Sequence, residues 1–397
     1  MLFRNPMKPP KFRNFIALVV FVLALGLTLP ALAQEQNSDQ KPQSQTAPEA
    51  GGPQGDIGPI IVPKKNPDDA TPPPPPPKPE VKNPAGMPDF SLHVDVSNVQ
   101  VPVLVTTKDG QFIPGLKEGN FKIYEDGVQQ QITNFTQKAD APITAVMLIE
   151  FSALNYYFMV DAVRDSYYFA DTLKPNDWVA VISYDMKPQI LADFTQNKQE
   201  IFGALNQLQI PGFSEANMFD ALYDTLDRVD RIQGRKYIVL IASGLDTFSK
   251  INYDKILKKI KDTPNVGIFT VSTGEMFRNW MEAHAWMGMG AQLRELSYLQ
   301  ADNEMHTFAK MTGGQWYHPT FEGELPEVFR DIASNIRNQY VLTYKPTNAK
   351  QDGTFRKLKV ELQAPDGGPL TIKDQKGKTL KPVIIARDGY TAKHEVE

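Results

Sequence analysis

The fold is decided by a nearly continuous apolar stretch, ITAVMLIEF, at Ile143–Phe151. Such a run is typical of a parallel strand that is buried on both faces of its sheet. Tyr237–Ala242 and Val266–Ser272 repeat the pattern, and Met159–Leu173 has the 3.6-residue apolar spacing of a helix. Strands that alternate with helices predict a doubly wound α/β domain with a mostly parallel sheet.

The other elements of this domain follow from the same two periodicities, and together they place it at residues 139–340. Further strands are expected at Asp177–Tyr184, Gln189–Phe194 and Gln315–His318, and further helices at Gln199–Leu208, Phe219–Val229, Asp254–Lys261, Glu304–Met311 and Glu324–Arg337.

Segments with the two-residue alternation of half-buried strands flank the domain at 89–138 and 341–397. Neither segment alone would bury much of a core, so we expect the two to form one small β-sandwich. Its strands are expected at Ser91–Thr106, Phe121–Tyr124 and Gln129–Phe135, with a hairpin turn at Gly127, and at Tyr340–Tyr344, Phe355–Leu362 and Pro382–Ala386.

The N-terminus has the pattern of a secretory signal peptide. Basic residues precede an apolar run at Phe15–Leu29, and Ala31-Leu32-Ala33, with a small residue on each side of the leucine, follows it. We expect residues 1–33 to be removed; an uncleaved anchor is the alternative, although the run is shorter than the roughly 20 residues a spanning helix needs. No later stretch is apolar enough to span a bilayer, so we expect an exported protein, periplasmic or secreted.

Residues 34–88 differ sharply in composition from the rest, with fifteen prolines and few large apolar side chains. Such a segment cannot bury enough apolar surface to offset the entropy of ordering, so a disordered linker is expected. Pro72–Pro77 favours a polyproline II helix. The linker would act as a spacer or, alternatively, as a ligand for a proline-binding module.

The composition excludes several classes of function. Forty-six acidic and 42 basic residues give a net charge of -4, which provides no broad positive surface for nucleic acid. The chain has no cysteine, so disulfides, thiolate catalysis and cysteine-built metal sites are excluded. Its five histidines are scattered and have no metal-binding spacing.

Several local sequences, taken in order, resemble the von Willebrand factor type A fold, and in particular the acidobacterial-type VWFA-related family of exported proteins. The likeness covers residues 90–391. It rests on Asn120–Gly127, Leu148–Ser152, Asp220–Asp224, Ile241–Thr247, Thr312–Gly314, Tyr340–Tyr344 and Ala386–Tyr390.

The resemblance implies a metal-ion-dependent adhesion site, in which an Asp-x-Ser-x-Ser loop, a threonine and a further aspartate hold a divalent cation. In this chain Glu150 stands at the first aspartate, Ser152 is kept, and Leu154 replaces the second serine. Asp220 occupies the threonine position and Ser243 the later aspartate position. The site is therefore expected to be degenerate, with no cofactor.

Two alternatives remain for these side chains. Glu150 and Asp220, with Asp246 turning in from the loop after the fourth strand, could hold Mg²⁺ or another divalent cation in a non-standard site. Otherwise Glu150 and Ser152 would bond to nearby backbone groups while Asp220 caps its helix.

The segment Glu275–Gln300 is rich in methionine and aromatic residues and is longer than the family pattern requires. It leaves the carboxyl end of a parallel strand, the edge at which open α/β sheets bind ligands. One interpretation is a protein-binding surface; the other is a helix with His284 among its apolar residues that packs on the domain. The candidate partner-binding residues are Phe277, Trp280, Met281 and Trp286.

A hydrolase would need Ser152 or Ser243 as nucleophile, a histidine such as His306 or His318 as base, and Asp246 to orient it. The chain has no Gly-x-Ser-x-Gly elbow and no phosphate-binding loop, so no catalytic residue is assigned. We expect a non-enzymatic adhesion or scaffolding module that binds a protein in the cell envelope or outside the cell.

Overall fold

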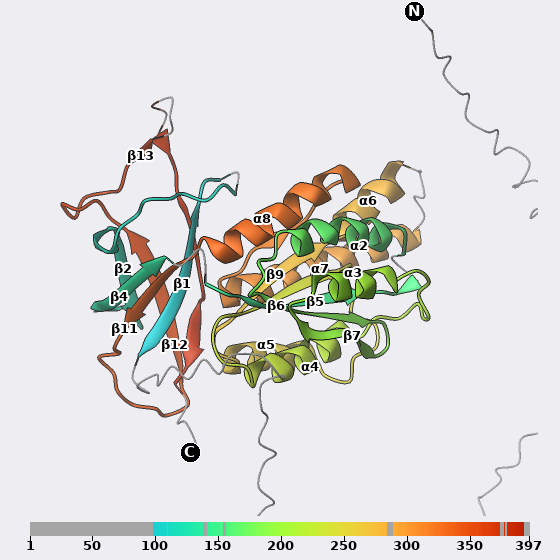
Figure 1. Ribbon diagram of the computed structural model, residues 1–397, viewed down its shortest axis with the longest axis horizontal. Coiled ribbons are helices and arrows are strands. Elements are labelled where there is room, and N and C mark those ends of the chain that lie inside the picture. The colour runs from blue at the N-terminus through green and yellow to red at the C-terminus, as the bar shows by residue number, and fades with distance from the viewer. Residues whose placement is uncertain are drawn as a thin grey trace, which may run out of the picture. The chain divides into compact units, whose positions relative to one another are not determined.

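A computed structural model describes residues 98–108, 110–137, 141–153, 156–283, 289–373, 377 and 379–392 (Figure 1). The expected signal peptide and linker lie outside these residues, as does the first part of the alternation that begins at Ser91. No helix within the described ranges combines the length and the apolar composition that crossing a membrane requires.

The α/β domain is built on one sheet with the strand order β10-β9-β8-β5-β6-β7. Neighbouring strands are parallel except for β6 and β7. Every residue of β5 is buried, because the sheet is covered on both faces. The strands are β5 (Thr144–Glu150), β6 (Trp178–Tyr184), β7 (Pro188–Thr195), β8 (Lys236–Ala242), β9 (Val266–Ser272) and β10 (Trp316–Tyr317).

Helices form a layer on each face of this sheet (Figure 1). One core lies between the sheet and α2 (Tyr156–Asp171), α3 (Lys198–Asn206), α6 (Gly274–Ala283) and α8 (Leu325–Arg337). The other core lies between the sheet and α4 (Met218–Asp230), α5 (Tyr253–Asp262) and α7 (Met289–Thr312). The doubly wound α/β fold predicted from the sequence is confirmed.

The flanking segments form two antiparallel sheets around a shared core. One sheet has the order β15-β1-β11-β4 and the other β16-β12-β2-β3, so each contains strands from both sides of the α/β domain. This confirms the expected sandwich. Its strands are β1 (Val99–Thr106), β2 (Phe121–Glu125), β3 (Val128–Gln130), β4 (Ile132–Gln137), β11 (Tyr340–Tyr344), β12 (Phe355–Leu362), β15 (Val383–Ala386) and β16 (Gly389–Thr391); β13 (Ile372–Lys373) and β14 (Thr379–Leu380) form a separate hairpin.

The expected single strand Gln129–Phe135 is wrong in one respect, because it is divided between the two sheets. β3 pairs with β2 across a tight turn in which Gly127 has φ 84°, whereas β4 pairs with β11. The break follows Gln130, whose buried amide exchanges hydrogen bonds with Thr347 (2.9 and 3.0 Å). An inward-facing glutamine interrupts the alternation, and the chain changes sheets there.

The helix expected at Glu304–Met311 is much longer, since α7 begins at Met289. Tyr298, Ala301 and Met305 are buried at spacings of three and four residues, which is the pattern of one helix face. The aromatic and methionine content of the preceding segment obscured this periodicity.

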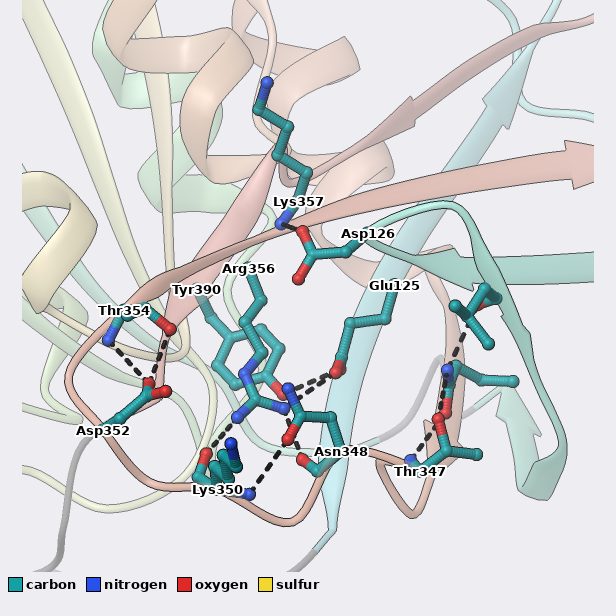
Figure 2. A network of polar contacts seen from close by, with 12 residues as sticks. Glu125, Asp126, Thr347, Asn348, Lys350, Asp352, Thr354, Arg356, Lys357 and Tyr390 are labelled. Atoms are coloured by element: carbon teal, nitrogen blue, oxygen red, sulfur yellow. Dashed lines mark hydrogen bonds and ion pairs between the residues drawn. The ribbon is translucent and has the colours of Figure 1, made fainter.

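The sandwich encloses a buried polar network around Glu125 (Figure 2). Arg356 Nη1 donates to Glu125 Oε1 at 2.9 Å, and the hydroxyls of Tyr344 and Tyr390 donate to Oε2 at 2.6 and 2.8 Å. The guanidinium also donates to the carbonyls of Asn348 and Lys350. The segments before and after the α/β domain both contribute to this network. Its hydrogen bonds therefore join residues more than 200 positions apart in the sequence.

Candidate functional site

Three of the predicted site residues meet at the carboxyl edge of the parallel sheet. Glu150 is the last residue of β5, Ser152 lies two residues further on, and Ser243 directly follows β8, the neighbouring strand. Ser152 Oγ donates to Glu150 Oε1 at 2.7 Å, and both the amide and the hydroxyl of Ser243 donate to Oε2 at 2.7 Å. All three residues are at most 1% exposed.

The charge of Glu150 has no cationic partner among the described residues: its hydrogen bonds come from the two serines. Burial raises the pKa of Glu150, while the serine hydrogen bonds partly offset the rise by favouring the ionised form. The nearby Tyr184 is also buried, and its hydroxyl has no hydrogen-bond partner in the described structure. Burial, together with the charges of Glu150 and Asp246, holds the pKa of Tyr184 well above its usual value.

The other two predicted carboxylates belong to a separate network. Asp246 Oδ1 accepts hydrogen bonds from the backbone amide of Phe219 at 3.0 Å and from the Ser249 hydroxyl at 2.5 Å. Asp220 accepts from the amides of Lys250 and Ile251 at 3.0 and 3.2 Å. Asp220 therefore does not cap its own helix: Asp246 binds the first turn of α4, and Asp220 fixes the loop that carries Asp246.

The five positions divide into two groups whose carboxylate oxygens accept hydrogen bonds from the chain itself. Within the described ranges no group of three or more acidic or histidine side chains is placed to hold a metal ion. Leu154, the position of the lost serine, lies outside the described residues.

Two loops pack against each other beside this edge. The Ala216 amide donates to Thr247 Oγ1 and the Thr247 amide donates to the Ala216 carbonyl, both at 2.9 Å, and the Phe213 carbonyl accepts from the Ala153 amide at 2.7 Å. The side chains of Phe213 and Phe248 on these loops are 55% and 65% exposed. Sequence analysis missed both; the available signal was a phenylalanine among small and polar residues in each loop.

The segment expected to form a partner-binding loop begins with helix α6. Phe277 packs against Phe158 and Tyr298, with ring centroids 5.8 and 4.9 Å apart, whereas Trp280 is 43% exposed. Arg278 and Asp302 join α6 to α7 through an ion pair of 2.6 Å. The helical interpretation is thus correct for α6. The Met281 side chain, His284 and Trp286 lie outside what the structure describes.

The serine and histidine side chains are not arranged as a nucleophile and a base. Ser152 and Ser243 donate their hydroxyl protons to Glu150. His318 contacts Glu275 at 2.8 Å, and the rings of His306 and His318 pack on Trp316. Among the described residues, neither Ser152 nor Ser243 forms a hydrogen bond with a histidine.

A family model matches part of the chain. Residues 158–310 match the family model of the von Willebrand factor type A domain. No curated protein sequence matches the chain.

Solved structures of similar fold include proximal thread matrix protein 1 from the mussel byssus (10% identity, TM-score 0.37), with 54% of this chain aligned to 51% of that one. The chain thus spans about half the length of the mussel protein. A von Willebrand factor type A protein from Catenulispora acidiphila (12% identity, TM-score 0.37) aligns over 75% of this chain and 76% of its own. BatB from Bacteroides thetaiotaomicron (11% identity, TM-score 0.33) aligns over 48% of this chain and 98% of its own.

Proposed function

This chain contains a von Willebrand factor type A domain, and we propose that the domain binds a protein partner at the carboxyl edge of its sheet without a divalent cation. The observation that carries the proposal is the hydrogen bonding of Glu150. Its carboxylate accepts from Ser152 and Ser243, so the polar groups at the position of the adhesion site satisfy one another. A ligand carboxylate would find no cation there to bind.

Affinity must then come from other contacts at the same edge. Exposed aromatic side chains are suited to this, because aromatic residues are enriched at protein interfaces and a few well-buried side chains carry most of the binding energy there. Phe213 and Phe248 extend from the loops beside Glu150, and Trp280 is exposed on α6, which follows β9 at that edge. These three side chains are the anchors we propose.

The domain would act outside the cytoplasm as an adhesion or scaffolding module. The basic and apolar N-terminus would direct export, and the proline-rich segment 34–88 would hold the folded part at a distance from its surroundings. Type A domains are in general interaction modules without catalysis, and we propose no reaction for this one.

The test is capture of a partner from envelope extract by the purified mature protein, with and without a chelator. We expect capture to be insensitive to chelator and to fall at least tenfold in the double variant Phe213→Ala/Phe248→Ala, with a smaller loss in Trp280→Ala. Val128→Ala, an exposed apolar residue on the sandwich, is the control and should bind as wild type.

Melting temperatures of all variants separate lost contacts from lost folding. If the aromatic variants melt normally and bind as wild type, or if chelator abolishes capture, the proposal is wrong.

A further inference from the structure

A large cavity lies at the opposite, amino edge of the parallel sheet. Its volume is about 1070 Å³, and it is bounded by residues of the α/β domain and by Val341 and Thr343 of β11 in the sandwich. Cavities of this size hold organic molecules rather than single ions. Nothing in the function proposed above uses this cavity.

Three residues that line the cavity form one row across adjacent strands. Thr144 on β5 is in register with Trp178 on β6 and with Lys236 on β8. Residues in register on parallel strands project from the same face, and adjacent strands are about 4.8 Å apart. The row therefore presents an indole N–H, a hydroxyl and an ammonium group to the same side of the sheet.

Two of these donors lack an acceptor. Trp178 Nε1 is buried with no hydrogen-bond partner in the described structure. Lys236 is only 4% exposed, and its ammonium forms no hydrogen bond or ion pair with any described residue. Burial lowers the pKa of Lys236 to about 8, and the charge of Asp230 only partly offsets this. A buried ammonium without an acceptor is costly, and an anion in the cavity would relieve that cost.

The charges and apolar groups of the cavity wall fit the same conclusion. Arg235, Lys236 and Arg387 face a single acid, Asp230, among the described lining residues. Asp230 Oδ2 also lies 3.9 Å from the ammonium of Lys259, so Lys259 already balances part of the negative charge of Asp230. Apolar surface is supplied by Ile232, Tyr237, Val266 and Val341.

We propose that this cavity binds an organic anion, with its carboxylate or phosphate oxygens at Lys236 and Trp178 and its apolar body against the neighbouring wall. The site is independent of the partner-binding edge, because it lies at the other end of the strands.

The experiment is calorimetric titration of the purified mature protein with three probes of equal chain length: octanoate, octyl phosphate and neutral octan-1-ol. The decisive variant is Lys236→Met, which removes the charge and keeps the side-chain length. Lys359→Met, at an exposed lysine on β12, is the matched control. Trp178→Phe removes the indole N–H.

We expect at least one anionic probe to bind wild type and Lys359→Met about ten- to a hundredfold more tightly than Lys236→Met, the range for a hydrogen bond to a charged group. Trp178→Phe should weaken binding of the same probe by a smaller factor. The tighter of the two anions identifies the head group. Without a probe, Lys236→Met should melt at or above the wild-type temperature, because an unpaired buried charge is gone.

Three results would overturn the proposal. One is the absence of saturable binding of either anion up to millimolar concentration. The others are equal affinity of wild type and Lys236→Met for both anions, and binding of octan-1-ol as tight as that of the anions.

Discussion

Two buried glutamates, one in each part of the fold, have opposite surroundings. Glu125 in the sandwich accepts hydrogen bonds from Arg356 and two tyrosine hydroxyls. Glu150 in the α/β domain is equally inaccessible, but serine groups are its donors and no described cation contacts it. The first glutamate has the partners of a structural ion pair. The second is held by uncharged donors, which join the ends of two neighbouring strands.

The largest expected effect comes from breaking the ion pair. Arg356→Met leaves the Glu125 carboxylate buried without its cation, and we expect it to lower the free energy of unfolding by about 3–5 kcal/mol. Chemical denaturation measures this. Arg164→Met, where the side chain is 61% exposed, is the control and should cost less than about 1 kcal/mol. If Arg356→Met lowers the free energy of unfolding by less than about 1 kcal/mol, the ion pair does not stabilise Glu125, and the two glutamates do not differ in the way described.

A smaller effect is expected at the other glutamate. Ser243→Ala removes one hydroxyl donor of Glu150 but keeps the backbone amide, so the loss should be about 2 kcal/mol, as for one hydrogen bond to a charged group. Ser214→Ala, an exposed serine in a nearby loop, should be neutral. If Ser243→Ala is as stable as wild type, the hydrogen bonds of Glu150 do not hold the two strand ends together.

The smallest effect concerns pH. Because burial raises the pKa of Glu150 in the folded state, the folded protein holds this proton more tightly than the unfolded chain does. Stability from this group is present below its ordinary pKa of 4.5 and is lost as pH rises through the folded value. In Glu150→Gln the free energy of unfolding should decrease less as the pH rises. Unfolding curves of both proteins from pH 4 upward would show it, and parallel pH profiles would contradict the assignment.

Most of the fold could be predicted from the sequence because periodicity reports burial directly. The run at Ile143–Phe151 gave β5, and apolar alternation on both sides of the domain gave the sandwich. The errors occur where a polar residue is buried or an apolar residue is exposed. Gln130 faces inward and divides a strand. On α7 the exposed Leu296 and Leu299 lie among the buried Tyr298 and Ala301, which concealed the helix face.

The candidate site could be predicted only in part. The ends of parallel strands share an edge, so the meeting of Glu150, Ser152 and Ser243 followed from topology. Which donors satisfy which carboxylate depends on loop conformation, and the sequence pattern carries no information about that. Asp220 and Asp246 thus form a separate loop network, and the exposure of Phe213 and Phe248 was not foreseen.

The most direct test of the central claim is the melting temperature of the protein without residues 1–33 as Mg²⁺, Mn²⁺ and Ca²⁺ are added to millimolar concentration and then removed with a chelator. A cation that binds the folded state at a hundred times its Kd would stabilise it by about 2.7 kcal/mol. The variant Glu150→Asp/Leu154→Ser/Asp220→Thr/Ser243→Asp, which restores the ligands, should show such a shift. The account predicts no chelator-sensitive shift in the unmodified protein. A clear shift that chelator reverses and Glu150→Gln abolishes would contradict it.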